Sequence, residues 1–123
     1  MNRKQMAGLV EIAQLLKERN LSELSQIAAR RAALVKRQAA LHDQRAASRQ
    51  LVAQTPELGA VQAPFESWLH RADTRLRDDI SAVEQELEVQ KQKAAKAFGR
   101  HGNLSKMEHR LVTELGKRLN SAG

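Results

Sequence analysis

The 123-residue sequence contains no cysteine, no tyrosine, one tryptophan and two phenylalanines. The absence of cysteine excludes disulfides, thiolate metal sites and a cysteine nucleophile, and it is typical of a reducing compartment. Aromatic residues make up only 2% of the chain, although they usually supply much of the area buried in a globular core. The packed interior must therefore be built from smaller side chains.

Long apolar runs are also missing. No uninterrupted apolar stretch approaches the roughly 18 to 20 residues that span a bilayer. Glu11, Gln14 and Lys17 interrupt the segment that would have to be the apolar part of a signal peptide. We therefore expect a cytoplasmic protein that is neither exported nor inserted into a membrane.

The residues that are present favour helices. The hydrophobic share of 41% consists mostly of alanine and leucine, mixed with glutamate, glutamine, lysine and arginine, which are the strongest helix formers. Two prolines, Pro56 and Pro64, bracket the one stretch in which helix breakers cluster. The sequence predicts an all-α fold with a helix over residues 4–54, a turn over 55–64 and a second helix over 65–120.

Apolar residues in the first predicted helix recur at steps of three and four, which makes one helical face. Two seven-residue ladders follow, Ile27-Leu34-Leu41 and Ala32-Ala39-Ala46-Ala53. Such ladders predict a long antiparallel coiled-coil hairpin, with both ladders at the contact. Asn20 has the same phase, and a polar residue at such a position can fix the register of a coiled coil.

The second predicted helix contains a weak point at residues 99–103. Gly99 and Gly102 each cost about 1 kcal/mol relative to alanine in a helix interior. The apolar phase nevertheless continues from Ala97 through His101 to Leu104, which favours a continuous or kinked helix. The alternative is a three-helix bundle in which residues 104–119 form a short third helix that folds back.

Folding the two arms about residue 60 gives one hairpin domain over residues 1–123, in which facing residue numbers add to about 120. Asn20 then lies level with Gly99 and Gly102. Since both helices are weak at the same height, these three residues are hinge candidates.

No arrangement of residues predicts an enzyme or a cofactor. Glu84, Glu86 and Glu88 alternate along a helix and cannot converge on one substrate. The four histidines form no HxxxH or ExxH pair, so we expect no metal site and no small-molecule substrate.

The net charge of +7 is distributed unevenly. Residues 1–54 carry +6, residues 55–103 carry −1 and residues 104–123 carry +2. We expect much of the positive charge to pair across the hairpin with Asp73, Asp78, Asp79, Glu84, Glu86 and Glu88. The remaining surplus makes a basic strip a candidate partner-binding surface, formed by Arg30, Arg31, Lys36 and Arg37. Nucleic-acid binding is the less favoured use, because interleaved aromatic residues and any recognised module are missing.

Phe65 and Trp68 lie together at the predicted turn end of the hairpin, with Leu58 and Val61 nearby. They fit either a small apolar cap that closes the turn or a partner-binding patch, since exposed aromatic residues are favoured hot spots.

The whole-chain plan resembles the FliJ/YscO family, the small stalk proteins of flagellar and related type III secretion systems. Two local features add to the resemblance: Ala97-Phe98-Gly99-Arg100 followed by Leu104, and Ile27-Ala28-Ala29-Arg30-Arg31 before a leucine ladder. The resemblance implies a non-enzymatic stalk whose paired-terminus end enters the pore of a hexameric export ATPase. It also implies contacts with the export gate and with substrate chaperones, at the membrane-bound export apparatus.

Two other functions remain open from the sequence. One is an unrelated helical scaffold or chaperone that binds a partner helix. The other is a basic helical protein that binds nucleic acid.

Overall fold

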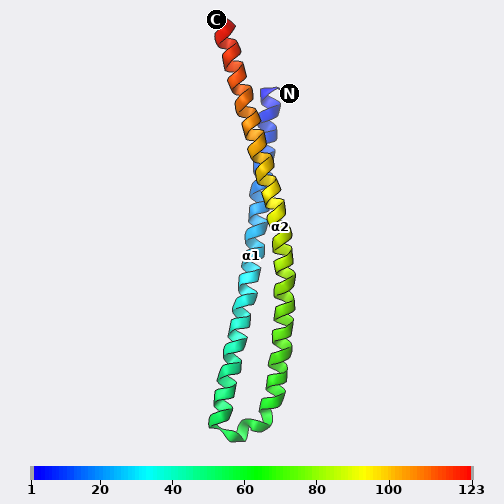
Figure 1. Cartoon of the computed structure of the whole chain (residues 1–123), viewed down its shortest axis with the longest axis vertical. Helices are drawn as coiled ribbons and strands as arrows, with labels where there is room; N and C mark the ends of the chain where they lie inside the picture. Colours follow the sequence, from blue (N-terminus) through cyan, green and yellow to red (C-terminus); the bar gives the residue numbers. More distant parts are fainter. Residues whose placement is uncertain (1, 123) are drawn as a thin grey trace. The chain divides into compact units, whose positions relative to one another are not determined.

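The computed structural model describes residues 2–122, and the regular structure in them is helical. Helix α1 comprises Arg3–Gln54, a short 3₁₀ helix (η1) comprises Pro56–Leu58, and helix α2 comprises Gly59–Ala122. A short linker joins the two long helices, which form the all-α helical hairpin that the sequence predicts (Figure 1). Within the described residues, neither helix is long and apolar enough to cross a membrane.

The connection between the helices is shorter than the sequence predicts. α1 ends at Gln54, as predicted, and Thr55 leaves the helix with φ −133° and ψ 79° because the next residue is a proline. The Leu58 amide donates to the Thr55 carbonyl at 3.0 Å, and α2 begins at Gly59. The predicted turn over residues 55–64 is thereby reduced to residues 55–58, and the second helix starts six residues before the predicted residue 65.

The early start of α2 places Pro64 inside the helix, whereas the sequence predicts it as the last residue of the turn. Its ring fixes φ near −65°, which suits a helix, but it has no N–H to donate. The carbonyl of Ala60, four residues earlier, therefore lacks its helical donor. One lost hydrogen bond near the start of the helix is a small cost in a helix of 64 residues.

α2 is continuous through residues 99–103. No described glycine has a positive φ, and a Cβ added to Gly99 or Gly102 would meet no further heavy atom within 4 Å. The glycines therefore occupy ordinary helical positions. The prediction of a continuous helix is confirmed, and the alternative short third helix over residues 104–119 is wrong.

The contact between the helices follows a seven-residue repeat, and we call its buried and half-buried positions the seam. An unbroken repeat of this kind is typical of helices that pack as a coiled coil. On α1 the principal seam ladder is Met6, Ala13, Asn20, Ile27, Leu34, Leu41 and Ser48. On α2 the seam alternates steps of four and three, through Gln62, Glu66, Leu69, Asp73, Leu76, Ile80, Val83, Leu87, Gln90, Ala94, Ala97, His101, Leu104, Glu108, Leu111 and Leu115.

One of the two predicted ladders on α1 belongs to the seam and the other does not. Ile27, Leu34 and Leu41 lie in the seam, as predicted. The second ladder is exposed on the outside of α1, together with other alanines of the same segment; its members are Ala32, Ala39, Ala46 and Ala53. The prediction that this ladder lies at the contact is wrong, because the ladder of Ile27, Leu34 and Leu41 turns the opposite side of α1 toward α2.

The register of the hairpin also differs from the prediction. Hydrogen-bonded partners on the two helices have residue numbers that add to between 110 and 116, rather than about 120. The short connection over residues 55–58 moves the midpoint of the hairpin toward the amino terminus. Asn20 therefore lies level with Gln90 and not, as predicted, with Gly99 and Gly102.

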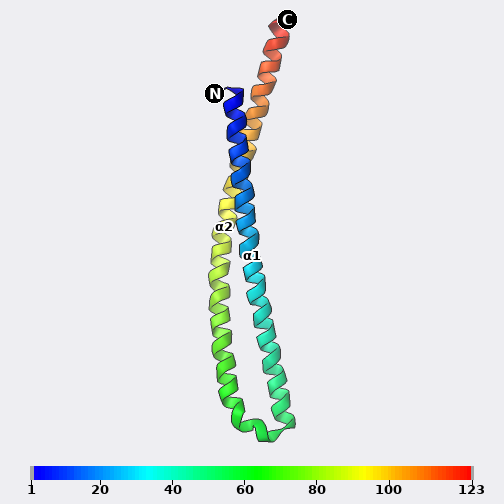
Figure 2. The ribbon, with the colours of Figure 1, turned by 180° about the vertical axis from the view of Figure 1, so that it is seen from behind.

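The chain divides into two compact units, and both helices contribute to each. The terminal unit comprises Met1–Ser25 and Glu88–Gly123, and the turn unit comprises Gln26–Leu87. Figures 1 and 2 show α1 and α2 side by side within each unit. In both views the end of α2 continues past the start of α1 in the terminal unit, which agrees with the exposure of Leu119.

Candidate protein-binding surfaces

The predicted basic strip lies in the turn unit, and half of it is paired. Arg30 Nη2 donates to Glu86 Oε1 at 2.7 Å. Arg31 contacts Glu84 Oε1 through Nη2 at 3.0 Å and through Nε at 3.1 Å. These cross-helix pairs neutralise both arginines and confirm the predicted pairing with Glu84 and Glu86.

Lys36 and Arg37 are the unpaired half of the strip. Both side chains are exposed, and neither makes an ion pair within residues 2–122. The same holds for Asp78, Asp79 and Glu88, which the sequence predicts as partners of the strip. The observed register places Asp78 and Asp79 at about the height of Arg37 and Lys36, yet these exposed side chains do not pair.

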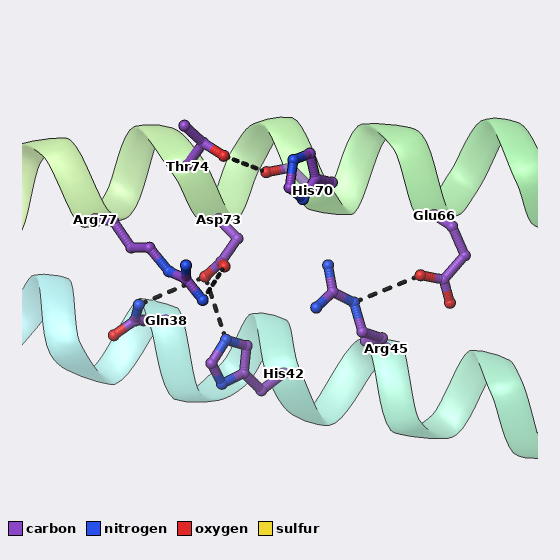
Figure 3. Close-up of polar contacts among 8 residues, drawn as sticks. All are labelled: Gln38, His42, Arg45, Glu66, His70, Asp73, Thr74 and Arg77. Carbon is purple, nitrogen blue, oxygen red and sulfur yellow. Dashed lines mark hydrogen bonds and ion pairs between the residues drawn. The ribbon is translucent and has the colours of Figure 1, made fainter.

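Asp73 is the most buried charged residue of the described chain, with 4% of its surface exposed. Gln38 Nε2 donates to Asp73 Oδ1 at 3.5 Å, and His42 Nε2 lies 3.2 Å from the same oxygen (Figure 3). Arg77, one turn further along α2, places Nη2 3.0 Å from Asp73 Oδ2. His42 therefore faces Asp73, and not Asp78 or Asp79 as the predicted register required.

These contacts determine the protonation of Asp73. Burial by itself raises the pKa of the carboxyl group. The hydrogen bonds from His42 and Gln38 and the positive charges of Arg77 and His42 outweigh burial, so that the pKa lies below its ordinary value of 3.8. Asp73 is thus a paired carboxylate within the seam.

A second polar cluster surrounds Glu66. Arg49 Nε donates to Glu66 Oε1 at 3.1 Å. Arg45 Nε lies 3.5 Å from Glu66 Oε2, but it is buried without hydrogen-bond geometry (Figure 3). Glu66 is not among the residues predicted from the sequence, although its place in the four-three phase that continues through Asp73 indicates a seam position.

Phe65 and Trp68 form an exposed aromatic pair on α2 of the turn unit. Their rings are stacked, with centroids 6.0 Å apart and 15° between the planes. Phe65 is 37% exposed and Trp68 is 51% exposed. Such exposure fits a partner-binding patch better than a cap that closes the turn, and Val61, one turn before Phe65, is exposed as well.

The hinge candidates all lie in the terminal unit. Asn20 forms a polar layer of the seam with Gln90, whose Nε2 donates to the Asn20 carbonyl and to Asn20 Oδ1, both at 3.1 Å. Asn20 Nδ2 also donates to the Leu16 carbonyl at 2.8 Å. Both helices are continuous at Asn20, Gly99 and Gly102, and a hinge there stays a prediction.

The motif Ala97-Phe98-Gly99-Arg100 lies in the same unit. The ring of Phe98 is half exposed, and Lys17 Nζ lies 4.1 Å from its centroid. This cation–π contact joins α2 to α1. Ala97 is buried in the seam, whereas Arg100 is exposed.

The surplus charge is concentrated in the terminal unit. This unit contains twelve basic and six acidic residues, a net charge of +6, whereas the turn unit contains nine basic and eight acidic residues, a net charge of +1. Net charges counted over contiguous segments of the sequence do not show this difference, because the terminal unit combines residues 1–25 with residues 88–123. The strongest electrostatic attraction for an acidic partner is therefore in the terminal unit.

Within the described residues, no group of three or more histidine or acidic side chains could hold a metal ion. The candidate sites are thus the exposed aromatic pair, the free part of the basic strip and the basic terminal unit. No protein-family model, curated protein or solved structure matches the sequence.

Proposed function

We propose that this chain is a non-enzymatic coiled-coil adaptor of a bacterial flagellar or type III protein export apparatus, which engages the hexameric export ATPase and the export gate. The observation that carries the proposal is the terminal unit. The start of α1 packs there against α2, and the unit has a net charge of +6. The Ala97-Phe98-Gly99-Arg100 motif of the family resemblance lies in the same unit.

In this proposal the two units have different partners. The terminal unit enters the central pore of the ATPase hexamer, and ATP hydrolysis belongs to that partner. The turn unit offers Lys36, Arg37 and the stacked Phe65–Trp68 pair to the export gate or to substrate chaperones, since these side chains are exposed and unpaired with the rest of the unit. The adaptor works in the cytoplasm at the membrane-bound apparatus.

A pull-down and an ATPase assay with the export ATPase of the same organism test the proposal. The purified protein should bind the ATPase and increase its hexamer formation and turnover, more strongly at low than at high salt. The double substitution Lys106→Glu with Arg110→Glu reverses two exposed charges of the terminal unit and should abolish this stimulation.

The matched control reverses two exposed charges of the turn unit, Lys36→Glu with Arg37→Glu. This variant should stimulate the ATPase normally and fail instead in a cellular export assay. If neither the wild type nor the variants bind the ATPase, the adaptor function is wrong. Salt-sensitive binding to an oligonucleotide would then favour the nucleic-acid reading, and its absence would favour a scaffold with another helical partner.

A further inference from the structure

An apolar groove lies between α1 and α2 in the terminal unit, with a volume of about 410 Å³. Two buried alanines of the seam, Ala13 and Ala97, are among its lining residues. Leu9, Ile12 and Leu16 line it from α1, at steps of three and four that place them on one face. Because the seam residues here are small, the groove remains open to a further side chain from outside.

The apolar side chains of this groove are incompletely covered. Ile12 is 56% exposed and Leu16 is 46% exposed. Leaving such side chains in water forgoes the stabilisation that burial would give, about 25 cal/mol for each Å². A third helix laid along the groove would cover them, since a ridge of apolar side chains on one helix packs between two others.

The opposite side of the groove is basic. Lys93, Lys96 and Arg100 line it from α2, again on one helical face. All three are exposed, and none makes an ion pair within residues 2–122. An apolar stripe thus runs beside a row of three unpaired positive charges.

We propose that this groove binds an amphipathic α-helix of a partner protein, with acidic residues along one edge of its apolar face. The apolar face would cover Leu9, Ile12 and Leu16, and the acidic edge would lie against Lys93, Lys96 and Arg100. The α1 stripe extends over about 10 Å and the groove lining on α2, from Lys93 to Leu104, over about 16 Å, at 1.5 Å per residue. Two to three turns of a partner helix match these lengths.

The positive net charge of the terminal unit argues against a second copy of this chain as the occupant of the groove. The terminal unit has a net charge of +6, so that two copies would bring like charges together. The apolar lining decides against nucleic acid, which would meet the basic row but leave Ile12 and Leu16 uncovered. The proposal does not depend on the export function, because it rests on the groove alone.

The test uses the full chain and two synthetic helical peptides of about 18 residues with the same leucine face. One peptide carries glutamate along both edges of that face, and the other carries lysine at the same positions. Fluorescence anisotropy of the labelled peptides should show that the acidic peptide binds at least about tenfold more tightly than the basic one. Binding of neither peptide, or equal binding of both, would overturn the proposal.

Variants locate the binding site. Ile12→Asp should weaken binding of the acidic peptide about tenfold or more, whereas Leu51→Asp, at an equally exposed leucine of the turn unit, should leave it unchanged. The double variant Lys96→Glu with Arg100→Glu should bind the basic peptide more tightly than the acidic one. Its control, Lys106→Glu, lies outside the groove lining and should keep the preference for the acidic peptide. If Ile12→Asp fails to fold, the peptide preference of the Lys96→Glu, Arg100→Glu variant tests the proposal instead.

Two results would place the site or its occupant elsewhere. Loss of binding that is equal in the groove variants and their controls would show a nonspecific electrostatic contact. A concentration-dependent dimer in sedimentation, abolished by Ile12→Asp, would show that a second copy occupies the groove. Failure of ATPase stimulation with intact acidic-peptide binding would overturn the export function and leave this proposal standing.

Discussion

At the scale of single residues, Asp73 joins the largest set of polar contacts in the turn unit. Replacing it by asparagine keeps its shape but removes the charge that His42 and Arg77 face. We expect Asp73→Asn to lower the free energy of unfolding by about 1–2 kcal/mol, because hydrogen bonds to a charged group are stronger than neutral ones. Urea unfolding followed by circular dichroism measures the change.

The matched control for this substitution is Asp78→Asn. Asp78 is exposed and makes no ion pair within the described residues, so its replacement should change the free energy of unfolding by less than about 0.5 kcal/mol. Equal effects at both positions would mean that the contacts of Asp73 contribute nothing to stability.

The lowered pKa of Asp73 predicts a dependence of stability on pH. Because the folded state favours the ionised carboxylate, this contribution is fully present above the ordinary pKa of 3.8 and is lost as the pH falls through the lowered value. The difference in urea midpoint between the wild type and Asp73→Asn should therefore shrink below about pH 4. A difference that stays constant down to about pH 2.5 would contradict this linkage.

The sequence predicts some of these residue contacts and misses others, for one physical reason. Complementary charges near the same ladder were enough to predict that Arg30 and Arg31 pair across the hairpin. The identity of a partner depends on register, and register depends on the length of the turn. The predicted turn is too long by a few residues. The predicted register therefore does not place His42 level with Asp73, or Arg49 level with Glu66.

At the scale of elements, the glycine segment of α2 offers a test of helix continuity. Gly99 and Gly102 have helical backbones with open space where a Cβ would stand. We expect Gly99→Ala and Gly102→Ala to stabilise the protein by about 0.5–1 kcal/mol each, since alanine restricts the unfolded chain and favours the helix. Thermal unfolding measures both variants.

A destabilising result would mean that the segment needs a conformation that alanine cannot adopt. The same variants address the hinge prediction: if compliance at these glycines is used by a partner, the stabilised double variant should fold better and bind the partner less well. Equal binding would leave the glycines without a role in recognition.

Helix ends were predictable where local chemistry decides them. Gln54 ends α1 because Thr55 precedes a proline. The start of α2 was not predictable from Pro64, because a proline close to a helix start costs only one hydrogen bond and the surrounding residues favour the helix. The continuity of α2 was predictable from phase, since the four-three steps pass through His101 without a skip.

At the scale of the whole molecule, the two units should respond to salt in opposite ways. All cross-helix ion pairs of the described residues lie in the turn unit, whereas the terminal unit carries the like-charge surplus. High salt screens both attraction and repulsion. We expect amide hydrogen-exchange protection at about 1 M salt to fall about two- to fivefold in the turn unit and to rise in the terminal unit.

Mass spectrometry of exchange at low and high salt separates the two units, because their peptides do not overlap. A change of the same sign in both units would contradict the charge asymmetry. The asymmetry itself could not be predicted from contiguous segments, since residues 1–25 and 88–123 are joined only by the fold.

The exposed alanines of α1 affect the state from which the protein folds. Ala32, Ala39, Ala46 and Ala53 are exposed and lie outside the seam, yet alanine is the best helix former. Residues 26–54 should therefore keep fluctuating helix in the denatured ensemble, and urea should expose less backbone than the chain length implies. Because the backbone of residues 26–54 is already partly ordered before folding, this segment loses less conformational entropy when the seam forms.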